Sequence, residues 1–78
     1  MSAVAEILVE EIRKQPREDR GPIMKSILMS AGPEIEARVR QRSESLQQAG
    51  IEPRDALTEA FAAALHGPDG GKIINIMA

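Results

Sequence analysis

The chain has 78 residues and a single phenylalanine, and it contains no tryptophan, tyrosine or cysteine. Its length allows one small core, and the absence of cysteine with a lone histidine, His66, argues against disulfides and structural zinc as reinforcement. Small domains without such reinforcement commonly gain stability by association, so the composition predicts a homo-oligomer or a bound protein partner.

The N-terminal stretch has no basic segment followed by an apolar run, and glutamates at positions 6, 10 and 11 interrupt it. A signal peptide is therefore not expected. No apolar run approaches the roughly 20 residues that a membrane-spanning helix requires. The sequence predicts a cytoplasmic protein with no membrane partner.

The formal net charge of −2 argues against a general nucleic-acid binder, but the charges are unevenly distributed. Residues 13–42 hold eight basic and four acidic side chains, whereas both flanking segments are acidic. This layout favours complementary docking between segments or subunits.

Residues 2–15 have the pattern of a first helix, with Ser2 as its N-cap. Four apolar residues fall at helical spacing and form the expected inner face: Val4, Ile7, Leu8 and Ile12. Val9 does not fit this face, and it is either a stray exposed valine or a sign of a wider apolar face.

Residues 16–21 are charged and bounded by proline, so we expect a solvated loop there. A second helix is predicted from Pro22 to Gly32, where Gly32 and Pro33 end it. Met24, Ile27 and Leu28 lie on its apolar face. Such a methionine-containing helix is either a buried central helix or a surface that binds a partner.

A helical hairpin is predicted over residues 33–67, since each half opens near a proline and ends before a glycine, Gly50 or Gly67. The first half, residues 34–49, is highly charged and has a narrow apolar line that includes Arg42. Arg42 either lies along apolar surface with its guanidinium in water or pairs with a carboxylate across an interface. The second half is rich in alanine, and its Phe61 is the predicted centre of the core.

After a glycine-rich link, residues 72–78 form the most β-prone run of the chain, and we expect an extended tail. Its four large apolar residues either dock on the same chain, join a partner's sheet edge or pair with a second copy, or the tail is mobile. These residues are Ile73, Ile74, Ile76 and Met77.

No motif indicates catalysis or a cofactor. Residues 67–73 resemble a phosphate-binding loop only superficially, because Ile73 follows the lysine in place of Ser or Thr and His66 occupies the first glycine position. His66 has no nucleophile nearby in sequence, and its place at a helix C-terminus is favourable without an active site. We expect neither an enzyme, nor a metal site, nor a cofactor.

The sequence thus predicts an all-α fold: a compact array of four short helices over residues 1–67, with a link and apolar tail over 68–78. The expected function is a small protein-interaction module, an adaptor, regulator or assembly subunit, acting as a homodimer or on a larger partner. The candidate interaction residues are Met24, Ile27, Leu28, Arg38, Arg42, Ile73, Ile74, Ile76 and Met77. The alternative is a nucleic-acid-binding regulator that contacts phosphates through Arg38, Arg40 and Arg42.

Overall fold

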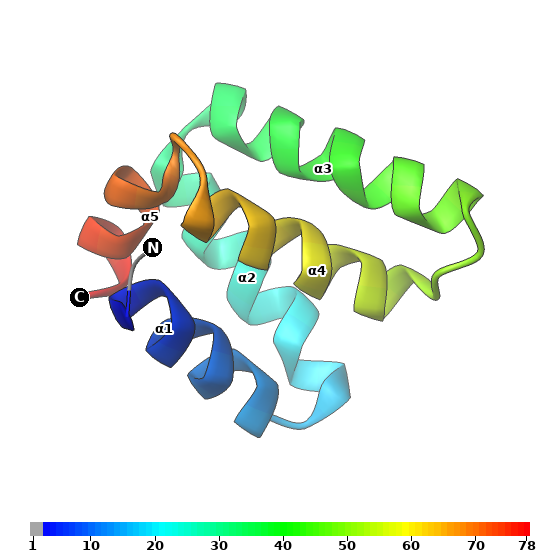
Figure 1. Ribbon diagram of the computed structural model, residues 1–78, viewed down its shortest axis with the longest axis horizontal. Helices are drawn as coiled ribbons and strands as arrows, with labels where there is room; N and C mark the ends of the chain where they lie inside the picture. The colour runs from blue at the N-terminus through cyan, green and yellow to red at the C-terminus, as the bar shows by residue number, and fades with distance from the viewer. Residues whose placement is uncertain (1–2) are drawn as a thin grey trace.

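The computed structural model describes residues 3–78, which form five α-helices and no strand (Figure 1). The all-α prediction is confirmed, with one helix more than expected. The helices are α1 (Ala3–Lys14), α2 (Arg17–Ala31), α3 (Pro33–Gln48), α4 (Pro53–His66) and α5 (Gly70–Met77). The predicted N-cap, Ser2, lies outside the described residues.

The antiparallel helices α3 and α4 lie side by side, and α2 packs against both of them. Helix α1 contacts α2, α4 and α5, but within the described residues it makes no contact with α3. Helix α5 lies near the start of α1 and closes one end of the molecule (Figure 1). The long α3–α4 pair therefore forms one side of the molecule and α1 another.

All five helices contribute to one buried core, and the predicted central residue Phe61 is only 1% exposed. Because much of α4 is alanine, its neighbours approach closely and Phe61 fills the space between them. The other buried members are Ala5, Val9, Ile12, Met24, Leu28, Ala31, Ile35, Val39, Ala60, Ala62, Leu65 and Ile73.

Helix α1 is rotated relative to the sequence prediction. Ala5, Val9 and Ile12 face the core, whereas Val4 and Ile7 are 51% and 60% exposed. Both sets have helical spacing, so the pattern alone could not choose between them. The face that includes the small Ala5 is the one that turns inward, and Val9 is a core residue.

The predicted loop over residues 16–21 is wrong, because α2 begins at Arg17. Pro22 lies inside this helix and removes only one backbone hydrogen bond. Tertiary contacts hold the first turn: Arg17 pairs with Glu52, which precedes α4, and with Asp55 of α4. Arg20 donates to the backbone carbonyls of residues 13 and 15 at 2.7 and 2.9 Å and so caps the end of α1.

The hairpin prediction is confirmed at its turn. Gly50 has a φ of 101°, its N–H donates to the Gln47 carbonyl, and the Ile51 N–H donates to the Leu46 carbonyl. This pair of bonds is the Schellman motif that the glycine signal predicts. The turn fixes α4 alongside α3.

The predicted extended tail is wrong, since residues 70–77 form helix α5 and dock on the same chain. Ile73 is fully buried, and Ile76 and Met77 follow it at helical spacing. Apolar contact with the other helices outweighs the β propensity of three isoleucines. Gly70 packs so closely that an added Cβ would collide with the Leu65 carbonyl oxygen.

Candidate interaction groove

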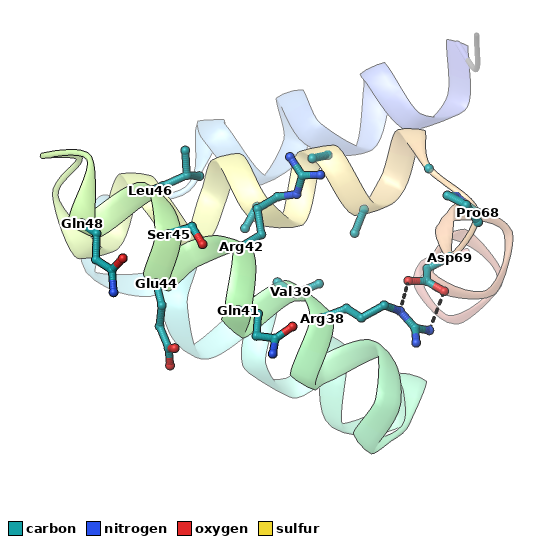
Figure 2. Close-up of a pocket in the computed structure, with 14 residues that line it drawn as sticks. Arg38, Val39, Gln41, Arg42, Glu44, Ser45, Leu46, Gln48, Pro68 and Asp69 are labelled. Atoms are coloured by element: carbon teal, nitrogen blue, oxygen red, sulfur yellow. Dashed lines mark hydrogen bonds and ion pairs between the residues drawn. The ribbon is translucent and has the colours of Figure 1, made fainter.

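A groove of about 810 Å³ lies between α3 and α4 (Figure 2). On the α4 side its wall is made of residues with small side chains or none: Ala60, Ala63, Ala64 and Gly67. The two helices pack closely, but these short side chains leave the surface hollow where α3 and α4 meet. Val39 and Leu46 supply apolar surface from α3. We call this hollow the α3–α4 groove.

The Arg38–Asp69 pair lies at one end of the groove. Arg38 Nε donates to Asp69 Oδ2 at 2.9 Å and Nη2 donates to Oδ1 at 2.8 Å, a bidentate contact. Hydrogen bonding from Arg38 lowers the pKa of Asp69, and the same bond raises the pKa of Arg38. The pair connects α3 to the turn before α5 and neutralises the guanidinium of Arg38.

Arg42 lies one helical turn further along α3 and extends toward α4 in Figure 2. Within residues 3–78 its guanidinium has neither a hydrogen bond nor an ion pair. Arginine keeps its charge at every physiological pH and carries five donors suited to a carboxylate. The groove therefore combines apolar walls with a cation that the described part of the chain leaves unpaired.

The third arginine of this helix, Arg40, points to the opposite side and pairs with Glu36 at 3.0 Å. A second cavity of about 480 Å³ lies on that side, between α2, α3 and the start of α4. Met29 lines it and is 81% exposed. Helix α3 thus has a hollow on each side, of which the α3–α4 groove is the larger.

The structure separates the candidate residues named from the sequence. Met24, Leu28 and Ile73 are buried in the monomer, and Leu28 also lines the second cavity. Four others pack half-buried against the core: Ile27, Ile74, Ile76 and Met77. Arg38 and Arg42 alone among the candidates line the α3–α4 groove.

The alanines of the groove are not among the site residues that the sequence predicts. Ala60, Ala63 and Ala64 have the spacing i, i+3 and i+4, with Gly67 at i+7, which indicates one face of α4. The pattern could be interpreted as core, however, and in fact Ala60 is buried at the base of this face. The sequence pattern likewise does not predict that Val4, Ile7 and Met29 lie on the surface.

Over the described range 3–78, no cluster of three or more His, Cys, Asp or Glu side chains is placed to hold a metal ion. None of the helices in that range has the length and apolar character needed to cross a membrane. Comparisons with protein-family models, with curated proteins and with solved structures found no match to this chain. The groove and its charges are therefore the basis for any functional conclusion.

Proposed function

We propose that this protein is a small interaction module and that its α3–α4 groove binds an apolar segment of a polypeptide that also carries a carboxylate. The observation that carries the proposal is the unpaired guanidinium of Arg42 in a groove walled by alanine. The function is that of an adaptor, a regulator or an assembly subunit, and it requires no catalytic chemistry.

Helices bind in grooves when their apolar side chains at i, i+3 and i+7 reach the floor. The alanine wall lets the backbone of the bound segment approach closely, which increases the apolar surface area that is removed from water on binding. Arg42 would then form a charge-assisted hydrogen bond to an acidic side chain of that segment. Such an arrangement gives orientation through the charge and affinity through apolar burial.

The alternative, contact with nucleic-acid phosphates, is less well supported by the charges. Arg38 and Arg40 are both engaged by carboxylates of the chain, and of these three arginines only Arg42 has no partner within residues 3–78. A phosphate-binding surface needs several uncompensated cations to release counterions. We therefore favour a protein partner.

The test is a titration of the full, ¹⁵N-enriched chain with a synthetic helical peptide of alanine, leucine and glutamate, followed by amide chemical shifts. We expect the shifts to cluster on α3 and α4 around the groove. Arg42→Glu should abolish them, because it places a carboxylate where the peptide's own carboxylate must lie.

Arg54→Glu is the matched control, since Arg54 is exposed, lies on α4 and does not line the groove. It should leave the titration unchanged. Equal binding of a peptide with lysine in place of glutamate, or shifts away from the groove, would contradict the proposal. A short DNA duplex at low salt should produce no shifts at the three arginines, and shifts there would favour the alternative.

A further inference from the structure

The outer face of α1 is an apolar stripe that the other helices of the chain leave exposed. Val4 and Ile7 lie on it, and Glu11 follows at the next helical position, so the three share the spacing i, i+3 and i+7. The opposite face of α1 already supplies Ala5, Val9 and Ile12 to the core. Helix α1 thus has two apolar faces, of which one is exposed.

The chemistry of this stripe complements that of the α3–α4 groove. The stripe has apolar side chains at two positions and a carboxylate at the third, whereas the groove has an alanine wall and the guanidinium of Arg42. Glu11 pairs at 3.2 Å with Lys14, but both side chains are more than half exposed. A solvent-exposed pair of this kind contributes little stability, so the carboxylate can exchange partners at low cost.

We infer that the segment bound in the α3–α4 groove is helix α1 of a second copy of this chain. Val4 and Ile7 lie on the alanine wall, and Glu11 of one copy bonds to Arg42 of the other. The inference rests on the proposed function, because it names the occupant of the same groove. The net charges of the two segments are also opposite: the N-terminal segment with α1 is acidic, and the middle of the chain, which holds Arg42, is basic.

The two surfaces lie on different sides of the monomer, since α1 makes no contact with α3 within the described residues. The contact between copies is therefore head-to-tail, with α1 of one chain on the groove of the next. An interface of one short helix in one groove is small, and the association is weak and reversible.

Analytical ultracentrifugation of the full chain tests this inference with a charge exchange. We expect the average mass to rise with concentration up to about 1 mM, the range in which interfaces of under about 1,200 Å² become populated. Glu11→Arg and Arg42→Glu should each raise the dissociation constant on the order of tenfold or more. An equimolar mixture of the two variants should associate again, because the guanidinium introduced in α1 of one copy then meets the carboxylate introduced in the groove of the other.

Two further variants distinguish the stripe from general charge effects. Val4→Ser combined with Ile7→Ser should also abolish association, because it removes the apolar contact, whereas Arg54→Glu should leave association unchanged. All the substituted side chains are exposed, so each variant should fold like the wild type. Circular dichroism of each variant checks this.

A monomer at every concentration overturns the inference, as does association that neither the stripe nor the groove variants weaken, or a mixture that fails to reassociate. If the acidic peptide still binds the groove through Arg42, the proposed function stands and only the identity of the partner is wrong. If the peptide does not bind either, both proposals fail.

Discussion

Asp69 shows how a single side chain can connect two helices. It precedes α5 at the N-cap position, yet its carboxylate makes no capping bond and accepts two hydrogen bonds from Arg38 of α3. The ion pair therefore fixes the turn before α5 to α3, whereas α5 itself packs against α1, α2 and α4. The sequence showed both residues, but their pairing over 31 positions depends on the fold and could not be predicted from spacing.

This pairing predicts a pH dependence of stability. Since the pKa of Asp69 is lowered in the folded chain, its contribution is present above the unfolded pKa and is lost as the pH falls through the folded value. Asp69→Asn should lower the Tm at neutral pH, and the difference from the wild type should narrow in strong acid. Thermal melts followed by circular dichroism measure both.

Glu44→Gln is a charge-matched control, because Glu44 is exposed and forms no ion pair within residues 3–78. It should produce a smaller change in Tm. A difference between wild type and Asp69→Asn that stays constant from neutral to acidic pH would contradict the role of this ion pair.

At the scale of elements, the sequence predicted best where backbone chemistry is local. The ends of α3 and α4 are set by proline and by Gly50, whose positive φ few other residues adopt, and both boundaries were predictable. The start of α2 could not be predicted, because Arg17 and Arg20 stabilise it through partners outside α2. Which face of α1 turns toward the core likewise depends on its packing against α2, α4 and α5.

The sequence predicts an extended tail in place of helix α5, because a short apolar run with isoleucines fits both the helical and the extended period. The docking of α5 depends on Gly70, which lies against the backbone of Leu65. Gly70→Ala should lower the free energy of unfolding by about 1 to 3 kcal/mol, because the new methyl group forces α5 away from α4. Urea denaturation followed by circular dichroism measures the change.

Gly71→Ala is the matched control, since a Cβ at this neighbouring helical position meets no atom within 4 Å. It should be neutral or stabilise the protein by up to about 1 kcal/mol, because alanine favours a helix over glycine. Equal effects of the two substitutions would show that α5 does not pack against α4 as the structure has it.

At the scale of the whole molecule, the described residues are compact, with a radius of gyration of 11.4 Å, close to the value of about 11.5 Å expected for a folded chain of this length. Among the surfaces that residues 3–78 leave uncovered are the α3–α4 groove with Arg42, and the stripe of Val4, Ile7 and Glu11. Of these, the sequence indicated only Arg42, because the others depend on which helix faces turn inward.

The central claim is that these two surfaces bind each other between copies. Because the chain has no cysteine, a nitroxide placed at Gln48→Cys on the groove is the only label. In a mixture of labelled, unenriched chain and unlabelled ¹⁵N chain, signal attenuation arises only between copies. We predict attenuation of the amides of residues 4–11. Absence of intermolecular attenuation, or attenuation confined to other helices, would contradict the claim.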